Sequence, residues 1–427
     1  MDHVIKYIIR FLLGDDVSGN LVPAIGYTAD RSLFHHYNIV IIPSGFFEEM
    51  YGHVDSLPRL PLQEIEGVPF LFGSSMLERI GDTIIVHADL IASTYFLITR
   101  YEEMIRREIR DEHGRFPGKE SLPYRAGFID RPVVDEYRLL IRGWLKETHI
   151  PVREIKQEVR KIYLTHDIDA PFLYRSRKGF IRSLLDGRGL ISSIKGRWGA
   201  KDNDPYYTFP WIEELQLNLQ KRVGKKKVQS IYFFKAGGRT KQDKPFYNLK
   251  GRDIQSLIRQ AKALGAEIGL HSSYQAGLKP LLIAEEKKKL EEAREMRVHL
   301  NRHHFLACRE PEDMLHLEAA GITDDFTMGY ADVAGFRLGT TYPVRWINPV
   351  TRRLSPLTLH PLLIMDCTLD RYMGLNYDEA FEYGIKLINH VKHTGGELVL
   401  LWHNAVLSED SGSYHRLLYM NILNELQ

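Results

Sequence analysis

Short apolar runs alternate with amphipathic segments along most of the chain. From residue 161 onward, runs rich in β-branched and aromatic residues predict strands, and apolar residues spaced three or four apart predict helices between several of them. We expect strands at 161–168, 228–236, 266–272, 302–306, 335–341, 361–367 and 397–403, with a weaker one near 322–327, and the clearest helix at 282–300. Seven or eight strands that alternate with helices favour a distorted parallel β/α barrel over a sandwich.

The first 150 residues have a different pattern. Short β-type runs at 36–43, 68–72 and 83–87 precede a helical stretch at 92–110. The chain from 146 to 161 is charged and contains Pro151, which suits a linker. We therefore predict a smaller α/β accessory domain over residues 1–150 and a β/α barrel over 160–427.

The composition is that of an ordinary globular protein. Among 427 residues, 44% are hydrophobic and 26% are charged, and 57 basic against 55 acidic residues leave a net charge of +2. This balance argues against nucleic acid as a partner, and no stretch approaches the ~20 apolar residues of a membrane span. The apolar residues at 4–13 are interrupted by Lys6 and Arg10, which favours a first helix or strand over an export signal. With only two cysteines, a disulfide framework is excluded, and we expect a cytoplasmic protein.

Two carboxylates follow the first expected barrel strand. Asp167 and Asp169 lie two residues apart, so their side chains project to the same side. Two such carboxylates repel each other unless a cation or a shared proton separates them. A metal ligand beside a general base is one solution, and capping of the following turn and helix is the other.

Imidazoles and a guanidinium end other expected strands. His271 follows one strand, and His403 is delivered by an apolar strand, as a catalytic acid in a dry pocket would be. Arg302 and His304 share one face of a further strand, while His303 points away. Each group alone also suits a structural role, but barrel enzymes place their chemistry at this end of the strands. Their recurrence there favours a catalytic site.

The order and spacing of these motifs resemble the polysaccharide deacetylase family (carbohydrate esterase family 4). The sequence Thr165-His166-Asp167-Ile168-Asp169 stands where the family has T-F-D-D-G, and Ser230-Ile231-Tyr232-Phe233-Phe234 stands where it has A-T-F-F. Gly265, Glu267, Ile268, His271 and Ser272 match the motif G-H-E-I-x-x-H-[ST], Arg302 and Phe305 match the third motif, and Leu401-Trp402-His403 matches L-x-H. The resemblance covers roughly residues 160–405.

The resemblance implies a barrel that holds a divalent metal, usually Zn²⁺. Carried over to this sequence, it makes Asp167 the catalytic base, Asp169 and His271 metal ligands and His403 the catalytic acid. Arg302 would then orient the base carboxylate.

One position of the implied ligand set departs from the family pattern. Where the family has its second ligand histidine, four residues after His271, this chain has Gln275. Gln is a poor ligand for zinc compared with imidazole. We expect His304 to replace it, and water that completes the metal's coordination is the alternative.

The function that the resemblance implies is metal-dependent hydrolysis of an amide-linked acetyl or other acyl group on an amino sugar of a polysaccharide or its precursor. One alternative is a degenerate barrel that binds glycan without hydrolysis, which Gln275 favours. Another is a metal amidohydrolase that acts on a small nitrogen compound.

A basic insertion lies between the first two expected barrel strands, at about 171–227. It carries Arg175, Arg177, Lys178, Arg182, Arg188, Lys195, Arg197 and Lys201, and then the aromatic run at 206–211. The pattern favours a solvated basic helix followed by a new helix with Pro210 in its first turn. The alternative is weak contact of the 171–201 segment with an anionic glycan or a phosphate-linked lipid carrier.

Overall fold

Seven parallel strands form a closed barrel in the computed structural model, which describes residues 1–14, 24–175, 177–185 and 189–426. The strands are β7 (Lys161–Ile168), β8 (Val228–Lys235), β9 (Glu267–Ser272), β10 (Leu300–His303), β11 (Asp324–Met328), β13 (Leu354–Met365) and β14 (Glu397–Leu401). Their order is β11-β10-β9-β8-β7-β14-β13, and pairing of β11 with β13 closes the ring. The strand β12 (Val344–Ile347) pairs antiparallel with β13. The predicted parallel β/α barrel is confirmed.

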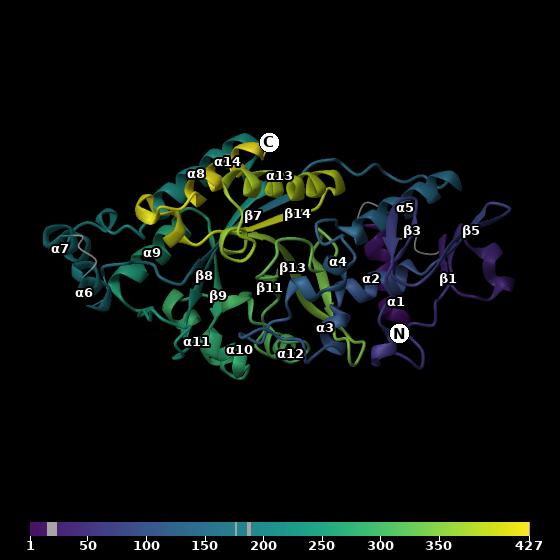
Figure 1. Ribbon diagram of the computed structural model, residues 1–427, viewed down its shortest axis with the longest axis horizontal. Coiled ribbons are helices and arrows are strands. Elements are labelled where there is room, and N and C mark those ends of the chain that lie inside the picture. Colours follow the sequence, from purple (N-terminus) through teal and green to yellow (C-terminus); the bar gives the residue numbers. More distant parts are fainter. Residues whose placement is uncertain (15–23, 176, 186–188, 427) are drawn as a thin grey trace.

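Helices cover the outside of the barrel (Figure 1). They are α8 (Phe209–Val223), α9 (Arg252–Ala263), α10 (Tyr274–Leu278), α11 (Leu282–Arg294), α12 (Glu312–Ala319), α13 (Tyr377–Thr394) and α14 (His415–Glu425). Because helices cover one face of each strand and the barrel interior the other, most strand residues are buried whichever face they point to. All five residues of β14 are buried, for example. Pro210 lies in the first turn of α8, as the sequence predicts.

The expected strand at 335–341 is wrong. These residues form a buried loop, in which Gly339 has φ 66° and its N–H donates to the carbonyl of Phe336 at 2.9 Å. A left-handed residue closes a turn and cannot continue an extended strand. The apolar side chains of this run are buried because the loop packs against the N-terminal part of the chain, where Arg337 pairs with Glu103.

The N-terminal part contains a four-stranded sheet with the order β1-β2-β6-β5. Its elements are α1 (Asp2–Leu13), β1 (Ile25–Tyr27), β2 (Ile39–Ile41), β3 (Gln63–Ile65), β4 (Val68–Phe70), β5 (Gly73–Ile80), β6 (Thr83–Ala88), α2 (Leu90–Ile98), α3 (Tyr101–Ile105), α4 (Leu122–Arg125) and α5 (Val133–Glu147). The expected helix at 92–110 is divided into α2 and α3, because Arg100 adopts a left-handed conformation with φ 53°.

This part packs directly on the barrel chain, at the right in Figure 1. Arg337 donates to both oxygens of Glu103, at 2.9 and 2.7 Å, in a buried pair. The buried Asp135 accepts hydrogen bonds from Thr340 and Thr341. One cluster of buried apolar side chains continues from the N-terminal part into the barrel. Residues 148–160 form no helix or strand, and the domain boundary there stays a prediction.

The basic insertion lies at the opposite end of the molecule. It contains α6 (Arg177–Leu185) and α7 (Leu190–Trp198) before α8 (Figure 1). Part of the predicted basic segment lies outside the described residues, namely Arg188 and the side chains of Arg177, Lys178 and Arg182. Within the described ranges, no helix combines the length and the apolar character that crossing a membrane requires.

Candidate active site

Asp167 and Arg302 form a buried pair near the carboxyl end of the barrel. Arg302 Nη1 lies 3.1 Å from Asp167 Oδ1, and neither residue is more than 3% exposed. The guanidinium is held further by hydrogen bonds to Thr165 Oγ1 at 2.7 Å and to the carbonyl of Phe326 at 3.0 Å. Its carbon lies 4.7 Å from the centre of the Phe233 ring. Arg302 is thus fixed in one position and orients the Asp167 carboxylate.

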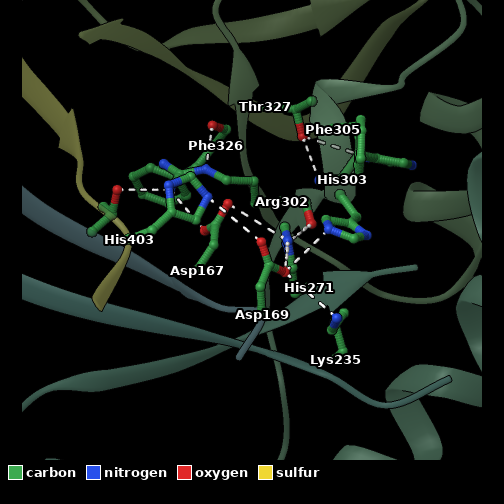
Figure 2. A network of polar contacts seen from close by, with 12 residues as sticks. Asp167, Asp169, Lys235, His271, Arg302, His303, Phe305, Phe326, Thr327 and His403 are labelled. Atoms are coloured by element: carbon green, nitrogen blue, oxygen red, sulfur yellow. Dashed lines mark hydrogen bonds and ion pairs between the residues drawn. The ribbon is translucent and has the colours of Figure 1, made fainter. Parts of the chain in front are cut away.

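Asp169, His271 and His304 bring three potential ligand atoms together. Figure 2 shows Asp169 beside His271. Asp169 Oδ1 lies 3.3 Å from Nε2 of His271 and 3.2 Å from Nε2 of His304. Burial acts to raise the pKa of Asp169, but the two imidazoles hold it well below its usual value. The carboxylate therefore stays ionised.

Each of the two imidazoles has a polar group beside its Nδ1 atom, on the side of the ring away from Asp169. His271 Nδ1 donates to the carbonyl of Arg302 at 3.0 Å, which leaves Nε2 directed at Asp169. His304 Nδ1 lies 3.6 Å from Oδ1 of Asp243, a carboxylate on the other side of the ring. A second group that holds the far nitrogen of a ligand histidine is typical of metal sites.

The donor set fits a divalent metal. Asp169 Oδ1 and His271 Nε2 are buried and make no hydrogen bond to any described residue, although they lie close together. Lys235 Nζ lies 3.7 Å from Asp169 Oδ1, too far for a hydrogen bond. Buried polar atoms without a hydrogen bond are costly, and a shared metal ion would satisfy both Asp169 Oδ1 and His271 Nε2. One carboxylate oxygen and two imidazole nitrogens, with positions left for water or substrate, form a donor set typical of catalytic zinc.

His403 lies across from this cluster and is backed by a buried carboxylate. Its Nδ1 donates to Asp366 Oδ1 at 2.8 Å, and its Nε2 lies 3.6 Å from Asp169 Oδ2. Burial acts to lower the pKa of His403, but Asp366 outweighs that effect and holds the pKa well above the usual value. Because Nδ1 is engaged, Nε2 is the nitrogen available to a substrate.

The predicted third ligand reaches the site from a turn and not from a strand. β10 ends at His303, and the next residues form a tight turn in which Phe305 and Leu306 have φ 61° and 53°. His304 begins this turn, and His303 is buried on the other side, where its backbone N–H donates to Thr327.

Gln275 does not take part in the cluster. It lies in the short helix α10, and its side-chain oxygen accepts a hydrogen bond from the backbone N–H of Arg239 at 2.9 Å.

A cavity of about 390 Å³ opens over these groups. It is lined by the site residues Asp167, Asp169, His304 and His403 together with Arg115, Phe305, Leu306, Cys367, Arg371 and Tyr372, among others. Arg115 comes from the N-terminal part of the chain. The cavity therefore has walls from both parts.

Sequence reasoning missed Asp366, Asp243 and Arg115, which hold other residues of the site in place. Asp366 directly follows β13, whereas the predicted strand runs to residue 367, so the sequence did not place Asp366 at a strand end. Asp243 and Arg115 stand in loops with no spacing signal. Only the folded chain places them here.

Comparisons with known proteins give limited similarity. Residues 4–150 match a family described as one of unknown function, DUF7033. No curated protein matches the chain. Among solved structures, a Mycobacterium smegmatis protein provisionally named a polysaccharide deacetylase is 15% identical, with 64% of this chain and 86% of that chain covered and a TM-score of 0.40.

A second similar structure is a mutant of BA3943, described as a CE4 family pseudoenzyme with restored enzymatic activity. It is 10% identical, with 63% of this chain and 62% of that chain covered and a TM-score of 0.32. TM-scores at this level do not establish a shared function, so the chemistry must be argued from the residues of this chain.

Proposed function

We propose that this protein is a metal-dependent hydrolase of the carbohydrate esterase family 4 type. It removes an acetyl or other acyl group from the nitrogen of an amino sugar in a polysaccharide or its precursor. The observation that carries this proposal is that the cluster Asp169–His271–His304 lies beside the two pairs Asp167–Arg302 and Asp366–His403. One cavity is lined by members of all three groups, namely Asp167, Asp169, His304 and His403. Amide hydrolysis needs a nucleophile, a proton acceptor and a proton for the departing nitrogen.

Asp169, His271 and His304 would hold the metal, for which Zn²⁺ fits the mixed oxygen and nitrogen donors. A divalent cation supplies Lewis-acid chemistry, because it polarises a carbonyl oxygen and makes water more acidic.

Asp167 accepts the proton of the attacking water. Its Oδ1 is held by Arg302, which fixes the plane of the carboxylate and leaves Oδ2 as the proton acceptor. Oδ2 lies 3.6 Å from Nε2 of His271, so the base lies beside the proposed metal ligands. A positioned base contributes roughly 10²–10⁴-fold to the rate.

His403 donates the proton that the leaving amine requires. Asp366 stabilises the protonated imidazole and directs Nε2 into the cavity. The base and the acid thus come from β7 and the end of β14, two neighbouring strands that keep their separation fixed.

The surroundings suit a carbohydrate. Tyr372, which is 38% exposed, lines the cavity of the site. A second cavity of about 410 Å³ shares Arg371, Ala405 and Val406 with the first and is lined by Tyr206. Aromatic side chains combine an apolar face with a polar hydroxyl, which suits stacking on a sugar ring. The adjoining cavities leave room for more than one sugar unit.

The direct test is release of acetate from N-acetylated sugars, both oligomers and monomers, by protein reconstituted with Zn²⁺. We expect release by the wild type and a loss of roughly 10²–10⁴-fold in His403→Ala. Measurable glycan affinity without release of acetate under any metal would instead establish the non-catalytic binding alternative. Release of an acyl group from small nitrogen compounds alone would establish the other alternative.

A further inference from the structure

The helix α7 buries small residues and exposes apolar ones, which is the reverse of a normal surface helix. Its buried residues are the small Ser193 and Gly196. A Cβ atom at Gly196 would lie 2.4 Å from the Tyr174 ring, so only a glycine permits this close packing. The side that contacts the rest of the protein is therefore built from small residues.

The outward side of α7 is apolar. Leu190, Ile191, Ile194 and Trp198 are 60%, 70%, 41% and 66% exposed. At about 100° per residue, these four positions fall within roughly 100° of arc on the helix. A surface helix of a globular protein normally turns such a stripe toward the core.

The neighbouring helix α6 extends this apolar surface. Ile181, Leu184 and Leu185 are 57%, 40% and 81% exposed. The two helices meet where Phe180 contacts Trp198, with ring centres 5.1 Å apart. Contiguous exposed apolar surface of this kind marks a site of interaction with a protein or a membrane.

The charge of the segment indicates which of the two, a protein or a membrane, binds this apolar surface. Residues 175–201, which we call the α6–α7 tip, contain eight lysine and arginine residues and one acidic residue, Asp186. On α7, Lys195 and Arg197 follow directly on the two sides of the apolar arc, and the Arg197 guanidinium lies 5.1 Å from the Trp198 ring centre. A helix with an apolar face, an aromatic residue and basic flanks is the pattern of helices that lie in the interface of an anionic membrane.

We propose that the α6–α7 tip docks on the surface of an anionic lipid bilayer. The apolar side chains insert at the boundary between headgroups and acyl chains, and the basic side chains contact anionic headgroups. This role does not depend on the proposed hydrolysis.

The tip is attached firmly to the barrel. Arg175 forms an ion pair of 3.0 Å with Asp253 of α9, and Asp204 accepts hydrogen bonds from the backbone of Leu173 and Tyr174. Leu173 and Tyr206, which flank the tip in the sequence, line the cavity that adjoins the site. Docking would thus bring the bilayer surface close to the entrance of the site.

Binding can be measured by co-sedimentation with vesicles of phosphatidylcholine alone and of phosphatidylcholine with phosphatidylglycerol. We expect the wild type to bind the mixed vesicles, more weakly as salt is raised. Lys195→Gln should lower the partition coefficient about fivefold on the mixed vesicles only. A blue shift of tryptophan fluorescence on binding should be lost in Trp198→Phe.

The decisive comparison is between two triple variants. Ile191→Ser/Ile194→Ser/Trp198→Ser should bind at least about tenfold more weakly. Leu281→Ser/Val350→Ser/Leu417→Ser, which replaces apolar residues that are 78%, 59% and 48% exposed elsewhere, should bind like the wild type. All of these side chains are exposed, so both variants should keep the wild-type melting temperature.

Three outcomes would overturn the proposal: no binding of the wild type to mixed vesicles, equal binding by both triple variants, or a wild-type dimer that the first triple variant alone dissociates. The last result would assign the patch to a second copy of this chain. None of these readouts requires hydrolysis, so the proposal is tested separately from the proposed function.

Discussion

The guanidinium of Arg115 donates a hydrogen bond of 3.0 Å to the backbone carbonyl of Phe305, the residue after His304. Arg115 itself is held by Asp111, whose Oδ2 accepts from Nε at 2.7 Å. Phe305 and Leu306 both have left-handed backbone conformations, which cost energy in residues other than glycine. The N-terminal part of the chain thus supports the turn that presents a proposed metal ligand.

Replacing Arg115 should therefore weaken metal binding. We expect Arg115→Ala to lower the affinity for Zn²⁺ roughly 10-fold, since removing groups that orient ligands costs about 10–100-fold. Competition with a chelator measures this directly. Arg107→Ala is the matched control, because Arg107 pairs with Glu312 at an exposed contact with the same part of the barrel chain. Equal affinities in the two variants would show that Arg115 does not support the site.

A pair of substitutions on β9 and α10 tests the proposed metal site. His271→Ala should abolish stoichiometric Zn²⁺ binding, because it removes one of three converging ligand atoms. Gln275→Ala should leave it unchanged, because the Gln275 side chain contacts Arg239 N–H instead. Elemental analysis of protein purified without chelator gives the metal content. Metal retained in His271→Ala would show that the site is elsewhere.

Asp167→Asn separates base catalysis from metal binding. The amide keeps the shape of the carboxylate but cannot accept a proton at neutral pH. We expect kcat for acetate release to fall roughly 10²–10⁴-fold, with little change in KM or in metal content. Wild-type rates in this variant would contradict the assigned base even if the metal is bound as proposed.

His360 predicts a pH dependence of stability that is unrelated to the site. It lies between Asp324 and Glu397, the first residues of β11 and β14, at 3.0 and 3.2 Å. Burial acts to lower the pKa of His360, but these carboxylates raise it to about 9. Because the folded pKa exceeds the unfolded one of about 6.5, the stabilisation is complete below about pH 6.5 and is lost as pH rises through 9.

Urea denaturation of the wild type and of His360→Gln measures this contribution. The difference in free energy of unfolding should reach roughly 2–3 kcal/mol at about pH 6 and become small near pH 10. The comparison with the variant removes the effect of other groups that titrate in the same range. A difference that does not change with pH would show that His360 is not charged in the folded protein.

The barrel and most of the candidate site at its carboxyl end were predictable from the sequence. Apolar runs that end in Asp167, His271 and His403 identify buried strands with polar residues at their carboxyl ends, and parallel strands bring these ends together. The prediction of a strand at 335–341 was wrong because apolar residues are equally suited to a buried loop. The local pattern of apolar residues predicts that a residue is buried, but it does not predict which other part of the chain buries it.

The sequence by itself determined the kinds of group available and the strand ends that carry them: Asp167, Asp169, His271, Arg302 and His403. Only the tertiary structure decided that His304 joins them while Gln275 turns to Arg239, and that Asp243, Asp366 and Arg115 hold the site from distant parts of the chain. The physical reason is that strand periodicity is local, whereas the direction of a side chain after a turn depends on backbone conformation and packing. The left-handed turn after His304 and the contact between Arg115 and Phe305 arise only when both parts of the chain are folded together.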